Sequence, residues 1–315
     1  MNASEVLASF KKAGKRVHLV GTAENGVIVA LDMEGRLFTV LDGEILNRVN
    51  PAAISGHSVM HDYLNPGGDG LWPAPEGTTL GYQYATGSWR VSPGLRMARY
   101  QILEAGDNTV SIGCEIDLIN SLGIGIPVFF ERKIQIEYGE KSLISKVRES
   151  ITYLGNKTLT NEECMIVPWT LCQFDCRIGC EVVFPCTDKS AVWDLYEESS
   201  DVRRIWKDGF CHTQTDGSQR YQIGMDGRVP WIEFRNPGRG LTVRRHAGPL
   251  QTGHAYIDIS DARPDVKPSG AGVRYSVYSD ANDFMEIEAV GGCPKTLFPG
   301  AVSSLEVTTE FYLTR

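Results

Sequence analysis

The chain has 315 residues and a mass of 34.8 kDa, with 42% apolar and 22% charged residues, a composition ordinary for a folded globular protein. No stretch approaches the ~18 apolar residues that a membrane span needs, and MNASEVLASFKKAGKR lacks the apolar core of a secretory signal. Thirty-one basic and thirty-nine acidic residues give a formal charge of −8, which disfavours nucleic-acid binding. We therefore expect a cytoplasmic protein without membrane or nucleic-acid partners.

The start of the chain predicts a short element followed by a hairpin. Residues 1–19 are expected to form an N-terminal arm or a short helix, centred on EVLASFKKAGK. GVIVALDMEGRLFTVLDG then places two apolar runs on either side of turn formers, which predicts a hairpin with its turn from Asp32 to Gly35.

Residues 65–77, NPGGDGLWPAPEG, contain three prolines and four glycines. Because a central strand disfavours proline, this segment predicts a rigidly shaped loop. Trp72 can offer its indole as a platform for a sugar ring, and Asp69 and Glu76 can accept hydrogen bonds from hydroxyls. The plainer interpretation is that Trp72 fills one end of the core while the two acids face water. The proline and glycine framing favours the functional interpretation.

Strict alternation marks the middle of the chain as strands. TVSIGCEIDLIN alternates apolar and polar residues over its length, as a half-buried strand does. PVFFERKIQIEYG continues the pattern, but Arg132 interrupts its apolar face. This arginine either faces a cavity or pairs with an acid such as Glu115 or Glu149.

Four of the eight cysteines, Cys172, Cys176, Cys180 and Cys186, lie close together in sequence without the paired spacing of a zinc site. If the first three shared one strand, consecutive sulfurs would lie about 13 Å apart, too far to share a metal. We expect reduced structural thiols, the alternative being a metal cluster in an irregular segment.

Near the end, FMEIEAV places Phe284, Glu286 and Glu288 on one face of a strand. The two glutamates would be separated by about 6.6 Å along the strand. Either a solvated outer face or a polar pocket accounts for this pattern.

Many strands separated by turn formers, few helices, and no linker or internal repeat predict an all-β fold. We expect residues 1–315 to form one domain, a sandwich of large antiparallel sheets with few short helices.

Several stretches, taken in order, resemble the galactose mutarotase-like superfamily, which includes the aldose 1-epimerases. They are GVIVALDMEGRLFTVLDGEILNRVNP, PGGDGLWPAPEG, IVPWTLCQF, and FMEIEAVGGCPKTLFPG followed by SSLEVTTEFYL. The resemblance runs from about residue 20 to the end and is closest to an uncharacterised bacterial branch. It implies a supersandwich of two large antiparallel sheets with a sugar site on a concave face.

The resemblance also implies roles for individual residues. Glu288 matches the position of the catalytic glutamate, and Glu286 lies beside it. Trp169 and Gln173 lie on the strand that lines the pocket, but the histidine expected there as the proton donor is missing. His61, close in sequence to the tryptophan loop, and His246, at the end of a predicted strand, are the candidate replacements.

Gly70 occupies a stretch where related loops often carry a basic residue, so Arg96, Arg99 and Arg132 are candidates for contacting hydroxyl or phosphate groups.

These expectations converge on an aldose 1-epimerase-like enzyme that acts on a sugar by general acid/base catalysis, without a cofactor or metal. Two alternatives stay open. One is a glycoside-cleaving or lyase enzyme on the same fold, which needs two carboxylates about 5–9.5 Å apart. The other is a carbohydrate-binding protein that has lost its proton donor.

Overall fold

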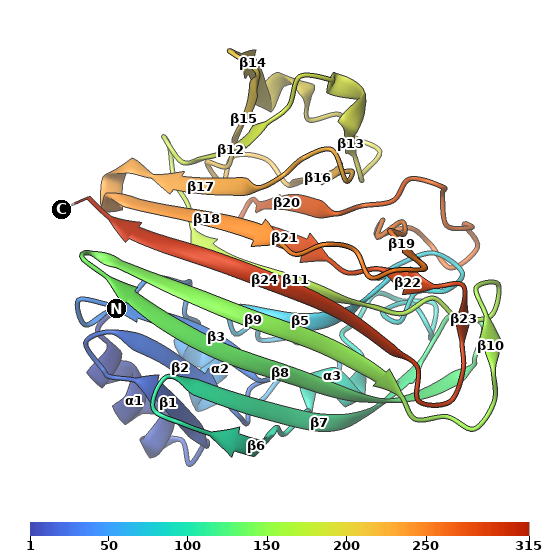
Figure 1. Ribbon diagram of the computed structural model, residues 1–315, viewed down its shortest axis with the longest axis horizontal. Helices are drawn as coiled ribbons and strands as arrows, with labels where there is room; N and C mark the ends of the chain where they lie inside the picture. Colours follow the sequence, from blue (N-terminus) through green and yellow to red (C-terminus); the bar gives the residue numbers. More distant parts are fainter. Residues whose placement is uncertain (315) are drawn as a thin grey trace.

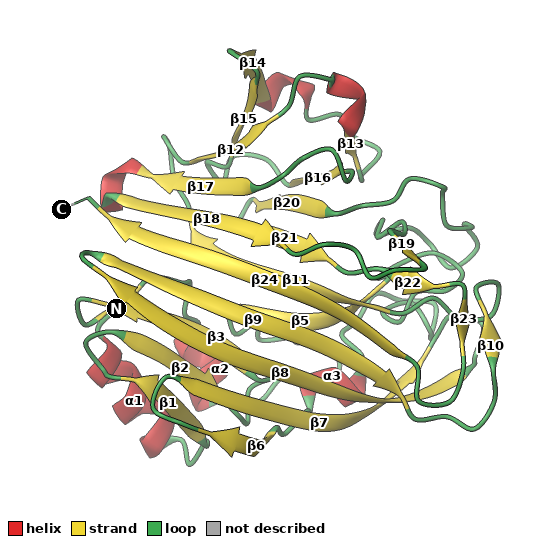
Figure 2. Ribbon diagram, viewed as in Figure 1, coloured by secondary structure: helices red, strands yellow, loops and turns green. Residues whose placement is uncertain are grey.

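Two large antiparallel sheets pack face to face in the computed structural model, which describes residues 1–314 (Figure 1). The first sheet has the order β1-β2-β3-β5-β11-β21-β20-β16-β13, with β4 paired to β3. The second has the order β14-β15-β12-β17-β18-β24-β9-β8-β7-β6. Strands dominate and helices are few and short, which confirms the expected all-β fold class (Figure 2).

The strands of the first sheet are β1 (Val17–Gly21), β2 (Gly26–Ala30), β3 (Arg36–Leu41), β4 (Glu44–Ile45), β5 (Asp69–Ala74), β11 (Val167–Asp175), β13 (Val192–Asp194), β16 (Tyr221–Met225), β20 (Tyr275–Asp280) and β21 (Phe284–Val290). Those of the second sheet are β6 (Gln101–Ala105), β7 (Thr109–Ile119), β8 (Gly125–Gly139), β9 (Ser142–Tyr153), β12 (Glu181–Pro185), β14 (Arg204–Lys207), β15 (Phe210–Gln214), β17 (Ile232–Asn236), β18 (Leu241–Ala247) and β24 (Val302–Leu313).

Small elements complete the chain. Two short ladders pair β10 (Leu159–Thr160) with β23 (Thr296–Leu297), and β19 (His254–Ala255) with β22 (Cys293–Pro294). The α-helices are α1 (Ala3–Lys12), α2 (Pro51–Ser55) and α3 (Pro93–Arg96), and the 3-10 turns are η1 (Lys189–Ala191), η2 (Asp201–Arg203) and η3 (Pro237–Arg239).

Helices α1 and α2 cover one end of the outer face of the first sheet. The Asn2 side chain caps α1 by accepting a hydrogen bond from the amide of Ser4. Val6 and Phe10 of α1 pack with Phe38 and Val40 of β3 in a small apolar cluster that is separate from the main core between the sheets. The helices leave the outer face of β5, β11, β21, β20 and β16 free of helical cover.

The predicted hairpin is confirmed, because β2 and β3 pair antiparallel around the turn at residues 31–35. TVSIGCEIDLIN forms β7, with Val110, Ile112, Ile116 and Leu118 buried as the alternation predicted.

The prediction of a loop for the whole proline-rich segment is wrong, because its middle forms the central strand β5 between β3 and β11. On one side, Pro73 lies opposite Pro168 near the end of the ladder between β5 and β11. On the other side, β3 pairs with β5 only through Leu37 and Asp69. Pro73 therefore has no partner strand on its other side that would require an amide donor.

Arg132 is fully buried between the sheets and pairs with Glu149, one of the two acids that the sequence suggested. Its Nη2 lies 2.7 Å from Glu149 Oε1, and its Nη1 donates to the carbonyl oxygens of Gly35 and Asp69 at 2.7 and 2.9 Å. Arg245 of β18 adds a second link, donating to Asp69 Oδ2 at 2.9 Å and to the carbonyl of Ile287 at 3.1 Å. Two arginines from the second sheet thus hold β5 and β21 of the first.

The clustered cysteines do not share one strand, because Cys172 lies on β11 while Cys176 and Cys180 lie beyond its end. All eight cysteines are free thiols. Among residues 1–314, no group of histidine, cysteine or acidic side chains has the arrangement of a metal site. Within the same residues, none of the helices has the length and apolar character to cross a bilayer.

Replacing Arg132 with methionine should lower the free energy of unfolding by about 3–5 kcal/mol, because Glu149 would be left charged and unpaired in the interior. Urea denaturation measures this loss. Lys133→Met, at the neighbouring exposed position of β8, should change stability by no more than about 0.5 kcal/mol. Equal effects of the two substitutions would contradict a structural role for the buried pair.

Candidate functional site

A cleft of about 410 Å³ lies on the outer face of the first sheet, beside the part covered by α1 and α2. Alternation along β21 places Glu286 and Glu288 on this face, while Met285 and Ile287 point to the core. The cleft is lined by Tyr63, Asn65, Trp72, Glu76, Tyr84, Trp89, Trp169, Leu171, Gln173, Tyr196, Arg220, Gln222, Asp261, Tyr278, Asp280, Phe284, Glu286 and Glu288. Eight of these residues are aromatic and five are acidic, so flat apolar surfaces alternate with carboxyl groups.

Glu288 lies at the floor of the cleft and is 0% exposed. Trp169 Nε1 donates to its Oε2 at 3.0 Å, and Gln222 Nε2 donates to the same oxygen at 3.2 Å. Burial raises the pKa of Glu288 to about 7, although hydrogen bonds from its neighbours, Ser276 among them, act to lower it. Near neutral pH this carboxyl group is therefore poised between its acid and base forms.

Glu286 and Glu288 form a coupled pair of carboxyl groups. Gln173 Nε2 donates to Glu286 Oε1 at 2.7 Å, which fixes the side chain from the neighbouring strand β11. Burial raises the pKa of Glu286 well above its usual range, and the charge of Glu288 and a hydrogen bond between the two carboxyl groups raise it further. The pair consequently keeps a proton at neutral pH, since two adjacent buried carboxyl groups resist ionising together.

A second acidic group lies in the loops beside the sheet. Trp89 Nε1 donates to Glu76 Oε1 at 2.6 Å, and the Tyr84 hydroxyl donates to Asp261. Burial, and then the charge of Asp261, raise the pKa of Glu76 to about 8. These two acids, far apart in the sequence, therefore act on each other inside the cleft.

Arg220 lies over the rings of Tyr196 and Tyr278, with its Cζ 4.5 and 5.6 Å from their centroids. It donates to both hydroxyls, at 2.8 and 3.0 Å, and its Nη2 is 3.7 Å from Asp261 Oδ2. Among the described residues that line the cleft, it is the only one with a permanent positive charge.

Trp72 and Trp169 form an aromatic corner, with ring centroids 6.4 Å apart in an edge-to-face arrangement. Behind this corner the guanidinium of Arg36 lies over Gly70, where an added Cβ would come within 2.5 Å of Arg36 Cζ. Arg36 comes from β3 and is paired with Glu34 at 2.8 Å. Glycine at position 70 therefore makes room for a buried arginine from the neighbouring strand.

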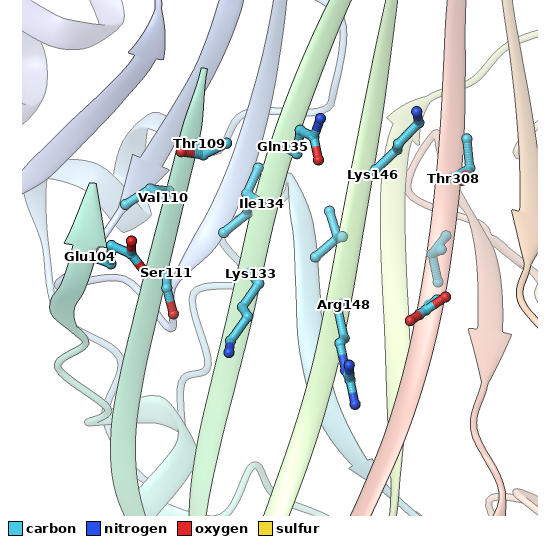
Figure 3. A pocket seen from close by; sticks show the side chains of 13 residues that line it. Glu104, Thr109, Val110, Ser111, Lys133, Ile134, Gln135, Lys146, Arg148 and Thr308 are labelled. Carbon is cyan, nitrogen blue, oxygen red and sulfur yellow. The ribbon is translucent and has the colours of Figure 1, made fainter. Parts of the chain in front are cut away.

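A larger hollow, of about 460 Å³, lies over the second sheet. Figure 3 shows side chains that line it, among them Lys133 and Lys146. It is a shallow surface over β7, β8, β9 and β24, lined by long solvent-facing side chains such as Lys133 and Lys146. It lacks the buried, mutually bonded polar groups of the cleft. Despite its size it is the weaker candidate for a specific site.

A sequence model described as a family of unknown function, DUF6786, matches residues 3–230, well over half of the chain. The chain belongs to the DUF6786 family. No curated protein matches its sequence.

Solved structures with low sequence identity to this DUF6786 chain have a similar fold. A galactose mutarotase-like protein from Lactobacillus casei superposes with a TM-score of 0.58 at 10% identity, covering 94% of this chain and 100% of its own. A proposed aldose 1-epimerase from Escherichia coli gives a TM-score of 0.55 at 14% identity, covering 95% and 100%. A galactose mutarotase related enzyme from Lactobacillus acidophilus gives 0.55 at 9% identity, covering 95% and 98%. The chain thus has the galactose mutarotase-like fold, as the sequence motifs predicted.

The cleft gathers six of the residues predicted for the site: Trp72, Glu76, Trp169, Gln173, Glu286 and Glu288. Two others, His61 and Arg96, line a neighbouring hollow that shares Tyr63 and Trp89 with the cleft.

The remaining predicted residues lie elsewhere in this DUF6786 chain. Asp69 and Arg132 are bound into the charge network between the sheets, because β5 and β8 turn these side chains inward. His246 lies on β18 in the second sheet, next to the inward-facing Arg245 and therefore on the opposite face of its strand, near Glu310. Arg99 is near Asp32, outside the cleft lining.

Sequence reasoning missed several cleft residues, including Arg220, Gln222, Asp261 and the tyrosines. The sequence held a signal for one of them, because Gln222 is a polar residue within the short, mostly apolar segment YQIGM. In the structure its side chain is buried, with 2% exposed. Asp261 and Tyr196 come from irregular segments whose path the local sequence does not specify.

Glu288→Gln should change how stability depends on pH. The pKa of Glu288 is higher in the folded state than in the unfolded chain, so its contribution to stability is full below about pH 4.5 and is lost as the pH rises through about 7. The glutamine variant should therefore lose less stability than the parent between these pH values, as measured by urea denaturation across that range. A matched control is Glu140→Gln, in an exposed turn. Parallel curves for the parent and the Glu288 variant would refute the shifted ionisation.

Proposed function

We propose that this protein is an aldose 1-epimerase-like enzyme that interconverts the anomers of a sugar by general acid/base catalysis. The observation that carries the proposal is the pair of buried carboxyl groups, Glu286 and Glu288, at the floor of an aromatic cleft. Aromatic faces suit the C–H surfaces of a sugar ring, and buried carboxyl groups suit its hydroxyls.

The reaction needs one group to take a proton and another to give one. Ionised Glu288 removes the proton of the anomeric hydroxyl, while protonated Glu286 donates a proton to the ring oxygen. The bond between the anomeric carbon and the ring oxygen breaks, and the open-chain aldehyde rotates about its first carbon–carbon bond. Ring closure on the other face of the carbonyl returns both protons. Glu286 thereby takes the role for which the sequence offered His61 or His246.

The similarity of fold supports this proposal, because structures with the same fold include proteins described as mutarotase-like or as proposed aldose 1-epimerases. A carbohydrate ligand is consistent with both the fold and the cleft. The cytoplasmic location, the absence of nucleic-acid partners, and the single domain over residues 1–315 stay predictions.

A second candidate is a carbohydrate-binding protein without catalytic activity. It is favoured by the fact that none of the described residues lining the cleft is a histidine. In that case the glutamate pair would only hold the sugar hydroxyls.

Glycoside cleavage fits the glutamate pair less well. Glu286 and Glu288 lie on the same face of one strand, whereas the two acids of a cleaving enzyme flank the glycosidic bond from different sides. A cleaving enzyme would have to use Glu76, from the loop after β5, together with one member of the pair.

The purified protein should speed the equilibration of a freshly dissolved aldose, followed by polarimetry or by NMR of the anomeric proton. Glu288→Gln and Glu286→Gln should each lower the catalysed rate by about 10²–10⁴, the usual contribution of a positioned proton-transfer group. Glu140→Gln is the control for loss of one carboxylate. The value of kcat/KM should rise as the pH increases through about 7, where Glu288 ionises, and fall again where the pair loses its second proton.

If sugars bind but equilibrate no faster than in buffer, the binding function replaces the enzymatic one. If aryl glycosides are cleaved and anomers are not interconverted, the cleaving alternative replaces it.

A further inference from the structure

Acidic side chains outnumber basic ones in the lining of the cleft. Its lining contains five acidic residues, Glu76, Asp261, Asp280, Glu286 and Glu288, against the single Arg220. Arg220 is 52% exposed and is already bonded to two tyrosine hydroxyls beside Asp261. The raised pKa values of Glu76 and Glu286 keep these two carboxyl groups largely protonated at neutral pH while the cleft is empty. A cation bound beside Glu76 would favour its ionised form, so the cleft can gain negative charge as such a ligand enters.

The hydrogen-bond donors of the cleft are largely used within the protein. The indole N–H groups of Trp89 and Trp169 donate to Glu76 and Glu288. The amide of Gln222 also donates to Glu288. The hydroxyls of Tyr84 and Tyr278 donate to Asp261 and Asp280. A ligand thus meets few free donors from these side chains.

Acceptors, in contrast, are left over. Gln173 is 1% exposed and lines the cleft, and its Oε1 has no hydrogen-bond partner while its Nε2 is fixed on Glu286. Glu76 is 8% exposed and accepts a hydrogen bond from Trp89 at Oε1, so its Oε2 is a second acceptor when Glu76 is ionised. A buried acceptor without a donor is unfavourable. The ligand is therefore expected to supply the donors.

We propose that the cleft selects a sugar bearing a protonated amine, a hexosamine, and that the ammonium group binds beside Glu76 and Asp261. This inference rests on the proposed function, because it assumes that the ligand is a sugar. An ammonium supplies three hydrogen-bond donors, and its positive charge would favour the ionised form of Glu76.

The same arrangement disfavours anionic sugars. A phosphate or uronate group would enter a cleft with five acids and would depend on Arg220 alone. Arg220 would have to leave its tyrosine partners to form a bidentate contact.

The test compares sugars that differ in one group: glucose with glucosamine, galactose with galactosamine, and each hexose with its 6-phosphate. Calorimetry at neutral pH should show the hexosamine binding about tenfold or more tightly than the matching hexose, because its ammonium group forms a charge-assisted hydrogen bond that the hexose cannot form. The 6-phosphates should bind more weakly than the hexoses.

Glu76→Gln is the discriminating variant. Glutamine keeps an oxygen for Trp89 Nε1 but removes the charge, so the affinity ratio of amine to hexose should fall to about one. Glu140→Gln should keep the parent ratio. Hexosamine binding to the parent should also release a proton, since a nearby cation lowers the pKa of Glu76 from about 8. This release appears as a heat that depends on the buffer and should be absent from the Glu76 variant.

The outcomes separate this inference from the proposed function. Equal affinity for hexose and hexosamine, or tighter binding of a phosphate, overturns the amine preference even if anomers interconvert faster. Selective hexosamine binding without faster anomer exchange supports the preference and refutes the epimerase activity. If none of these sugars binds, both proposals fail.

Discussion

The buried charges between the two sheets are the constraint on which the site depends. Arg132 of β8 and Arg245 of β18 reach across the core to carbonyl oxygens on β5 and β21. Those two strands carry Trp72 and the glutamate pair on their opposite faces. Arg245 binds the carbonyl of Ile287, the residue between the two glutamates, so the backbone beneath the proposed catalytic groups is fixed from the far side. Burying these charges is costly, and the hydrogen bonds from the arginines to both carboxylates and carbonyls offset much of that cost, although Asp69 Oδ1 and Arg245 Nε have no hydrogen-bond partner among the described residues.

The strands and the loops contribute different acidic side chains to the cleft. Glu286 and Glu288 lie within β21, near the middle of the first sheet, where neighbouring strands hold their side chains through Gln173, Trp169 and Gln222. Glu76 and Asp261 come from connecting segments. Proton transfer needs fixed geometry, whereas ligand choice varies through loops on a constant scaffold. The galactose mutarotase-like fold therefore does not by itself identify the sugar.

Alternation alone located the most important parts of this arrangement. It put Glu286 and Glu288 on one face of a strand, and it identified Arg132 as a charge on an apolar face, which the structure pairs with Glu149. The rule that central strands exclude proline, in contrast, led to the wrong prediction of a loop around Trp72. Pro73 lies in a central strand because its unpaired side meets no neighbouring strand, a fact that only the strand order reveals.

The histidines and Asp261 show a different limit of the sequence. His61 is close in sequence to the tryptophan segment yet lines an adjoining hollow, while Asp261 is remote and enters the cleft. Nearness along the chain was a poor guide because segments far apart in the sequence form the walls of the cleft. Such contacts depend on long-range pairing that no local pattern records.

A missing histidine need not remove acid/base chemistry from this fold. Two buried carboxyl groups in hydrogen-bond contact cannot both ionise easily, so one keeps a proton while the other is free to accept one. The pair then contains both the acid and the base that ring opening requires, at neighbouring positions of one strand. The same burial that produces this pair removes water from the floor of the cleft and strengthens each polar contact there. The charge of the cleft walls, more than the pair itself, would then decide which sugar reaches it.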